Sequence, residues 1–320
     1  MRDWFSGRTL PSQGRDASSI LVSRSPLLAK NMKKRKLVLP IILVGMFLYL
    51  FVWGGASTEL VSPQFKKVPV GLKDIIDNNL SGTNGTYGIV VKNLKNGQSY
   101  SQNEQRVFEP GSLYKIWILA SVFNQMEKGN LNEDEVLKED VATLNEKFNI
   151  DPELAELTEG DVTLSVKEAL NQMITISHNY AALLLTERIK LSTVASFLKE
   201  KGFNESTVGT NGESPASTPA DIAYFFEKLY KGELANKENT DKMIVLLKNQ
   251  QLNNKLPKYL PEGVSLAHKT GEIGWFSHDA GIVFSSSGDY IIVIMSESNS
   301  PPGAEDRIGK ISKAVYEYFN

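Results

Sequence analysis

Ser112 and Lys115 are a hydroxyl and an amine whose spacing could support nucleophilic chemistry. Pro110 and Gly111 interrupt the preceding strand-like pattern, and an apolar helical pattern follows directly. Ser112 is therefore expected at or near a helix N-terminus, where free backbone N–H groups and the helix dipole favour developing negative charge. Lys115 shares its helical face. If burial or a neighbouring cation lowers the pKa of Lys115, its neutral amine could take the hydroxyl proton and activate the serine.

The spacing of this pair is not specific by itself. Ser196 and Lys199 repeat it inside an ordinary amphipathic helical pattern. Most serines at helix starts only cap the helix. We therefore use Ser196 and Lys199 as an internal control for the first pair.

A second polar motif, Ser177-His178-Asn179, lies between two apolar helical patterns. On such a turn a hydroxyl and an amide could point together into a cleft. A simple capping turn has the same composition, because Ser and Asn favour these positions. This motif too needs support from the rest of the chain.

A third motif, Lys269-Thr270-Gly271, ends a strand-like pattern at residues 264–270. A cation and a hydroxyl on a strand edge suit a substrate carboxylate, and glycine lets a ligand backbone approach closely. Taken alone, a Lys-Thr-Gly motif at the end of a strand is more often a turn than a binding site.

The three motifs follow one another in a fixed order, 65 and 92 residues apart. Ser-x-x-Lys, Ser-x-Asn and Lys-Thr-Gly are signatures of class A β-lactamases and penicillin-binding proteins. Residues 70–320 resemble the class A β-lactamase family. The resemblance implies that Ser112 is the acylated nucleophile, that Lys115 is a base in acylation, and that Ser177 relays the proton to the leaving nitrogen.

The resemblance also assigns the substrate-binding groups. Asn179 would bind the substrate amide, and Lys269 and Thr270, followed by Gly271, would hold its carboxylate. The backbone N–H groups of Ser112 and Glu272 would form the oxyanion hole. If His178 is protonated, it would join the two lysines, and mutual repulsion would lower the lysine pKa values.

Two departures from the family pattern affect what the enzyme could do. His178 stands where the family has aspartate. In addition, residues 204–216 are too few for a full omega loop and lack its Glu-x-x-Leu-Asn sequence. Glu213 is the candidate deacylation base in this stretch, with Glu205 as the other possibility. Without such a base the acyl-enzyme would hydrolyse slowly. A D-Ala-D-Ala-type peptide then becomes as plausible a substrate as a β-lactam.

The pattern of elements predicts an α/β sandwich of the α+β type, with an antiparallel sheet flanked by helices and an all-helical subdomain beside it. A turn is expected at residues 93–98. Strands are expected at residues 87–91, 264–270, 280–285 and 290–296. Helices are expected at residues 70–79, 113–127, 165–177, 180–190, 194–201, 219–231, 241–250 and 308–319.

The N-terminal part of the chain predicts membrane attachment. Residues 1–36 carry a net charge of +7 and no periodic pattern, which indicates a disordered cytoplasmic tail, whereas the remainder carries −9. Residues 37–56 hold no charged side chain and follow a basic cluster, so we expect a transmembrane anchor with its N-terminus in the cytoplasm. A cleaved signal peptide and a buried soluble helix are the alternatives. Residues 57–67 would be a linker, and residues 68–320 the exported hydrolase domain.

Composition limits the other classes of function. There is no cysteine, which excludes thiolate zinc sites and a cysteine nucleophile. The three histidines form no compact cluster, so we expect no metal or cofactor. A basic N-terminal segment followed by an acidic remainder does not suggest nucleic-acid binding. Two alternatives remain: a non-catalytic cell-wall ligand-binding or assembly protein, and a Ser-His-Asp triad that uses His268 or His278.

Overall fold

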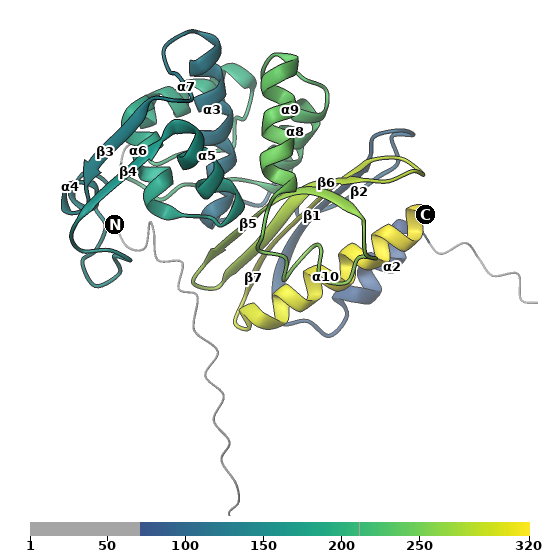
Figure 1. Cartoon of the computed structure of the whole chain (residues 1–320). Coiled ribbons are helices and arrows are strands. Elements are labelled where there is room, and N and C mark those ends of the chain that lie inside the picture. Colours follow the sequence, from purple (N-terminus) through teal and green to yellow (C-terminus); the bar gives the residue numbers. More distant parts are fainter. Residues whose placement is uncertain (1–70, 211) are drawn as a thin grey trace, which may run out of the picture. The chain divides into compact units, whose positions relative to one another are not determined.

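The computed structural model describes residues 71–210 and 212–320, which include a five-stranded antiparallel sheet in the order β2-β1-β7-β6-β5 (Figure 1). Its strands are β1 (Gly85–Asn93), β2 (Ser99–Gln102), β5 (Ser265–Ile273), β6 (Phe276–Phe284) and β7 (Tyr290–Ser298). Since β5 lies at one edge, its motif residues can face a neighbouring part of the protein.

Two helices, α2 (Leu72–Leu80) and α10 (Pro301–Phe319), pack together beneath one face of the sheet (Figure 1). Alternate residues of β7 show that both faces are covered. Ile292 and Ile294 join the core that includes α10, whereas Ile291 and Val293 join the larger core on the other side. A sheet buried on both faces explains why its inner strands read as continuous apolar runs.

The helical half lies against the other face. It begins with a 3-10 turn, η1 (Gly111–Tyr114), which leads into α3 (Lys115–Glu127). Every residue at positions 115–123 is buried, so α3 is surrounded by other elements over all but its last turn. The other helices of this half are α4 (Val141–Lys147), α5 (Val166–Thr175), α6 (Asn179–Ile189), α7 (Leu191–Lys201), α8 (Pro219–Tyr230) and α9 (Lys237–Lys248).

The prediction of an all-helical subdomain is wrong in one respect. A two-stranded antiparallel sheet, β3 (Val136–Asp140) with β4 (Asp161–Ser165), lies inside this half. Each strand has five residues, and only Leu137 among them is buried. Such short, largely exposed strands carry too weak a periodic signal to be read from the sequence.

The other predicted helices and strands are present, with shifted ends. β6 begins at Phe276 rather than at residue 280. His278 and Asp279, which we expected in a turn before this strand, therefore lie inside it and are fully buried. β5 continues past residue 270 to Ile273, so the Lys-Thr-Gly motif lies within the strand. The pairing of β5 with β6 sets the end of β5 and the start of β6, and no local sequence signal marks either position.

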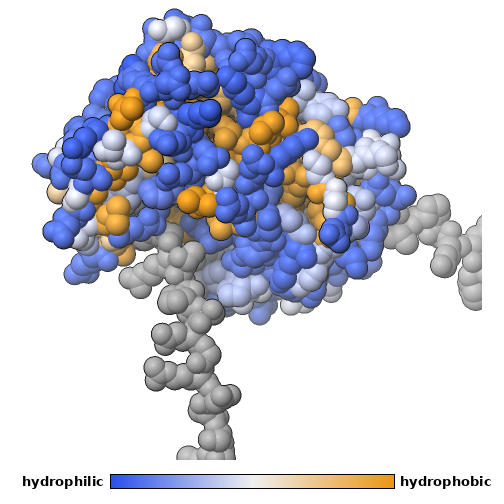
Figure 2. Space-filling view, in the orientation of Figure 1, coloured by the Kyte–Doolittle hydropathy of each residue, from blue (hydrophilic) through white to orange (hydrophobic). Residues whose placement is uncertain are grey.

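The predicted tail, anchor and linker at residues 1–67 lie outside the described residues. Among residues 71–210 and 212–320, no helix combines the length and apolarity that a bilayer span requires. Figure 2 shows one face of this part, where hydrophobic side chains form several separate patches among hydrophilic ones.

Candidate active site

The turn that carries Ser112 is pressed against the end of β5. Gly111 has φ 48°, a left-handed conformation that favours glycine. A Cβ atom on Gly111 would lie 2.7 Å from the backbone nitrogen of Glu272. Gly271 makes the reciprocal close approach, because a Cβ there would collide with the Pro110 carbonyl oxygen. Two glycines therefore allow the backbone of η1 to meet the backbone at Glu272, as an oxyanion hole built from both segments requires.

Lys115 is fully buried and makes three hydrogen bonds to the second motif. Its Nζ donates to the Ser177 carbonyl oxygen over 2.5 Å and to the Asn179 side-chain oxygen over 2.6 Å. It also lies 3.2 Å from Ser177 Oγ. The first two motifs, 62 to 64 residues apart, thus share one hydrogen-bonded group.

Lys269, also fully buried, approaches the same hydroxyl from β5. Its Nζ donates to Ser177 Oγ over 3.0 Å and to the Thr270 carbonyl oxygen over 2.9 Å. Ser177 Oγ therefore lies between the nitrogens of two lysines. Ser177 itself adopts φ 60°, a left-handed backbone conformation, on the turn between α5 and α6.

Burial, more than any other cause, lowers the pKa of both lysines. The pKa of Lys115 falls well below its usual value because the side chain is removed from water and because Lys269 is near, and the carboxylate of Glu156 partly opposes this. Burial and the cation of Lys255 lower the pKa of Lys269 to about 7. At neutral pH the site can therefore hold a neutral amine, which a general base requires.

His178 does not act as the third cation that the sequence suggested. Burial lowers its pKa, with a smaller contribution from Lys115. Its Nδ1 accepts the backbone N–H of Ala181 over 3.1 Å, so it caps the N-terminus of α6. A neutral ring nitrogen thus takes the capping role that an aspartate could have played.

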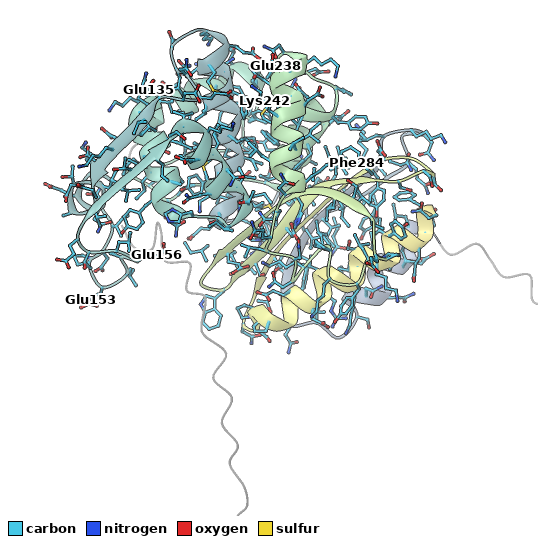
Figure 3. The ribbon with its side chains drawn as sticks, in the orientation of Figure 1. Glu135, Glu153, Glu156, Glu238, Lys242 and Phe284 are labelled. Atoms are coloured by element: carbon cyan, nitrogen blue, oxygen red, sulfur yellow. The ribbon has the colours of Figure 1, made fainter. Side chains whose placement is uncertain are left out.

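Two residues that the sequence analysis did not single out also belong to this cluster. Glu156, from the loop between α4 and β4, accepts a hydrogen bond from Asn179 Nδ2 over 2.7 Å. Figure 3 shows Glu156 and Glu153 on the helical half of the domain. Lys255 is fully buried and pairs with the carboxylate of Glu272. Neither residue belongs to a motif, and each reaches the site through a loop.

The alternative prediction of a Ser-His-Asp triad that uses His268 or His278 is wrong. Nδ1 of His268 is 2.8 Å from Asp279 Oδ1, and Nε2 is 3.2 Å from Asn253 Oδ1, so an amide and not a serine completes this group. The other carboxylate oxygen of Asp279 accepts the N–H of Leu256. His268 and Asp279 therefore fasten the loop that carries Lys255.

His278, the other candidate for that triad, has a structural role. Its Nε2 lies 2.8 Å from the carbonyl oxygen of Glu109, and its Nδ1 accepts the N–H of Ser296 over 3.0 Å. These contacts fix a neutral ring, and burial lowers its pKa to about 4. His278 therefore ties β7 to the segment directly before the Ser112 turn.

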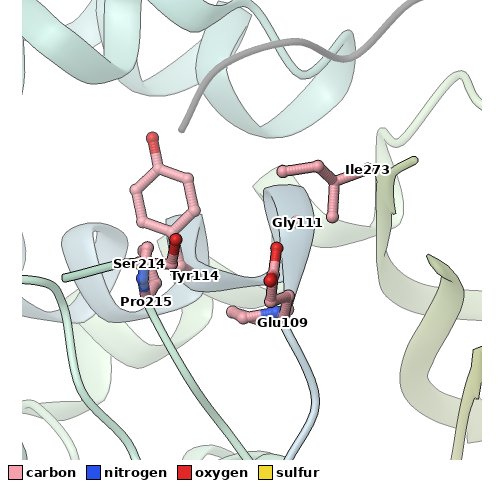
Figure 4. Close-up of a pocket in the computed structure, with 7 residues that line it drawn as sticks. Glu109, Gly111, Tyr114, Ser214, Pro215 and Ile273 are labelled. Atoms are coloured by element: carbon pink, nitrogen blue, oxygen red, sulfur yellow. The ribbon is translucent and has the colours of Figure 1, made fainter. Parts of the chain in front are cut away.

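A cavity of about 10 Å³, the size of a single water molecule, lies beside the Ser112 turn. Gly111, Tyr114, Ser214, Pro215 and Ile273 are among the residues around it (Figure 4). Glu213, the candidate deacylation base, directly precedes Ser214 in the chain, and its side chain is exposed. Glu205, which comes earlier in the loop, is exposed too.

The control pair behaves as expected. Ser196 and Lys199 lie within α7 and are both exposed, in contrast to the buried Lys115.

The described residues contain no group of three or more His, Asp or Glu side chains that could hold a metal ion.

The family model of the β-lactamase enzyme family matches residues 71–319. The chain belongs to this family. The class A resemblance read from the motifs is thereby confirmed, and the protein is a serine hydrolase of the β-lactamase type.

Curated relatives include two β-lactamases of Pseudomonas aeruginosa. VEB-1 is 24% identical over 267 residues, which are 76% of this chain and 89% of VEB-1. CARB-4 is 24% identical over 278 residues, which are 81% of this chain and 92% of CARB-4.

Solved structures share the fold. A β-lactamase from Sphaerobacter thermophilus superposes with a TM-score of 0.68 at 22% identity, covering 78% of this chain and 97% of its own. The protein PBP-A superposes with a TM-score of 0.67 at 25% identity, covering 78% of this chain and 95% of its own. The α+β fold with its antiparallel sheet is therefore that of β-lactamases and PBP-A.

Proposed function

We propose that this protein is a serine enzyme that β-lactams acylate on Ser112, and that its acyl-enzyme hydrolyses slowly. The observation that carries the proposal is the position of Ser177 Oγ between Lys115 and Lys269, 3.2 and 3.0 Å from their nitrogens. A lone Ser-x-x-Lys motif would not explain this arrangement, whereas proton transfer between a nucleophile and a leaving nitrogen does.

In the proposed acylation, the neutral amine of Lys115 takes the proton of Ser112, whose oxygen forms a bond to the lactam carbonyl carbon. The backbone N–H groups of Ser112 and Glu272 stabilise the resulting oxyanion. As the C–N bond breaks, Ser177 passes its proton to the leaving nitrogen and regains one from the Lys115 ammonium. The ammonium of Lys269 and the hydroxyl of Thr270 hold the substrate carboxylate.

Hydrolysis of the acyl-enzyme needs a base for water. Glu213 is the candidate because it directly precedes Ser214, which lines the water-sized cavity. Its exposed position favours a slow step, because an exposed carboxylate does not hold a water in a fixed direction. Slow hydrolysis makes a penicillin-binding enzyme that cleaves D-Ala-D-Ala-type peptides the second candidate. The likeness to PBP-A, a variant of which was solved as an acyl-enzyme with penicillin G, supports this reading.

The experiment follows the mass of the full chain over time with a fluorescent penicillin. A long-lived adduct on Ser112 would indicate a penicillin-binding enzyme, and a transient adduct with nitrocefin turnover would indicate a β-lactamase. An absence of adduct would leave a non-catalytic ligand-binding or assembly protein. Ser112→Ala should abolish the adduct, and Ser196→Ala, its control, should keep it.

Glu213 is tested in the same assay. If it is the base, Glu213→Gln will lengthen the life of the adduct without changing the rate at which the adduct forms. Glu205→Gln is the matched control from the same loop. If the adduct lives equally long in the wild type and in both variants, neither carboxylate is the base, and water hydrolyses the acyl-enzyme without one.

We also propose that residues 37–56 anchor the enzyme in the cell membrane, with residues 1–36 in the cytoplasm and the catalytic domain outside. The uncharged stretch and the basic cluster before it support this topology. Membrane fractionation after alkaline extraction is the test. The full chain should stay in the pellet, and a shorter product in the supernatant would indicate a cleaved signal peptide.

A further inference from the structure

A groove of about 450 Å³ lies at the end of the main sheet, outside the cluster of catalytic groups. This volume falls in the range of small-molecule binding sites, which run from about 300 to 1,000 Å³. Its side chains come from the ends of β1 and β7, from the segment before Ser112 and from the turn between β5 and β6. They include Asn84, Thr86, Arg106, Trp275, Glu297 and Asn299.

Trp275 presents a large apolar surface at this groove. Its side chain is 61% exposed, which makes it the most exposed tryptophan among the described residues. Its carbonyl oxygen accepts the backbone N–H of Ser298 over 2.9 Å, so the turn is fastened to β7. An exposed indole on a fixed backbone is suited to pack against the flat apolar face of a ligand.

The polar side chains beside Trp275 offer many hydrogen bonds and little net charge. Arg106 and Glu297 pair over 2.6 Å, and each keeps more than two fifths of its side chain exposed. The guanidinium therefore has donors left, and the carboxylate has acceptors left. Asn84 and Asn299 are both exposed, so their side-chain amides are accessible to a ligand. The groove suits an uncharged ligand rich in hydroxyl and amide groups.

The backbone of the groove does not offer a free strand edge. Thr86 pairs with Glu297 in one direction, and Glu297 pairs with Phe276 in the other. An extended peptide that binds by adding a strand needs unpaired backbone groups. A peptide therefore cannot bind here by adding a strand, whereas an indole face beside neutral polar groups suits a saccharide.

We propose that this groove binds a β-linked oligosaccharide of N-acetylated amino sugars. The apolar face of a sugar ring would pack on Trp275. Its hydroxyl and acetamido groups would bond to the Arg106–Glu297 pair and to the asparagine amides. This inference rests on the proposed function, since D-Ala-D-Ala-type peptides of cell walls are borne on such glycans. Trp275 follows Glu272 by three residues, so their Cα atoms lie within roughly 11 Å of each other.

The test titrates the full chain, in a detergent without sugar groups, with the tetrasaccharide chitotetraose. Binding is measured by calorimetry and by saturation-transfer NMR. Trp275→Ala should raise the dissociation constant about tenfold or more, and Trp275→Phe, which keeps an aromatic face, should change it less. Tyr230→Ala is the matched control, because Tyr230 is an exposed aromatic residue on α8 that does not line the groove.

Labelling by a fluorescent penicillin separates this inference from the proposed function. Penicillin carries no sugar, so Trp275→Ala should keep the wild-type rate of Ser112 labelling, which also shows that the variant folds. Wild-type protein that binds no chitotetraose at about 10 mM would overturn the inference, and so would binding that Trp275→Ala leaves unchanged. A failure of penicillin labelling in the wild type would overturn the proposed function alone.

Discussion

Lys269 donates a hydrogen bond to the hydroxyl of Ser177 over 3.0 Å, although 92 positions separate them in the chain. The contact joins the edge strand of the main sheet to a turn in the helical half. Lys115 reaches the same hydroxyl from α3. One serine oxygen therefore brings together the three motifs that the sequence spaces far apart.

Ser177→Ala should lower the second-order rate of acylation by a penicillin about 100-fold or more, because a positioned proton-transfer group contributes roughly 10²- to 10⁴-fold. Stopped-flow labelling gives this rate. The Ser196→Ala variant is the control and should react like the wild type. A loss of less than threefold in Ser177→Ala would contradict the proton relay.

The rate of acylation by a carboxylated β-lactam should fall as the pH rises above about 7, because the pKa of Lys269 is about 7 and its ammonium binds the carboxylate. On the acid side the rate should rise with pH, since Lys115 must lose its proton to act as a base. Labelling rates between pH 5 and 10 give both limbs of this profile.

Two variants should move the alkaline limb in opposite directions. Lys255 lowers the pKa of Lys269, so Lys255→Met should move the limb to higher pH. Glu272 raises the same pKa, so Glu272→Gln should move it to lower pH. A limb that stays in place in both variants would show that Lys269 does not set it.

Glu156→Gln should move the acid limb to lower pH. The carboxylate of Glu156 raises the pKa of Lys115, and its removal lets that pKa fall further. Glutamine keeps an oxygen that can accept from Asn179, so the amide stays in place. Glu153→Gln, from the same loop, is the matched control and should leave the profile unchanged. An equal shift in both variants would indicate a general charge effect of the loop.

Gly271→Ala should abolish detectable labelling of Ser112 in a protein that still folds. The added Cβ would collide with the Pro110 carbonyl oxygen and come within 3.0 Å of the Leu113 nitrogen, which displaces the turn that carries Ser112. Gly129→Ala is the control: Gly129 has φ 72° with no atom near its Cβ position, so the change costs about 1 kcal/mol of stability and no activity. Normal labelling of Gly271→Ala would disprove the close approach.

Acid should destabilise the fold through His278. Its pKa is about 4 in the folded protein and 6.5 when unfolded. Between these values only the unfolded state takes up the proton, so the stabilising contribution is complete above pH 6.5 and is lost as the pH falls toward 4. The full loss is on the order of 3 kcal/mol. Urea unfolding at pH 7 and 4.5 measures it, and the difference should shrink in His278→Gln. An unchanged difference would assign the acid sensitivity to other groups.

The sequence by itself determined the chemistry that the chain could do. Pro110, Gly111 and the apolar run that follows were sufficient to place Ser112 at a helix start, because breakers and periodicity act locally. The order of the three motifs was sufficient to indicate the family. The long helices and the three C-terminal strands also followed from periodicity.

Only the tertiary structure decided which groups meet and how they are charged. Lys255 and Glu156 belong to no motif and enter the site through loops, whose paths depend on distant contacts such as that between Asp279 and Leu256. The charge of His178 could not be read either, because a pKa depends on burial and on neighbours in space. Periodicity is a property of adjacent residues, whereas burial and convergence belong to the folded chain.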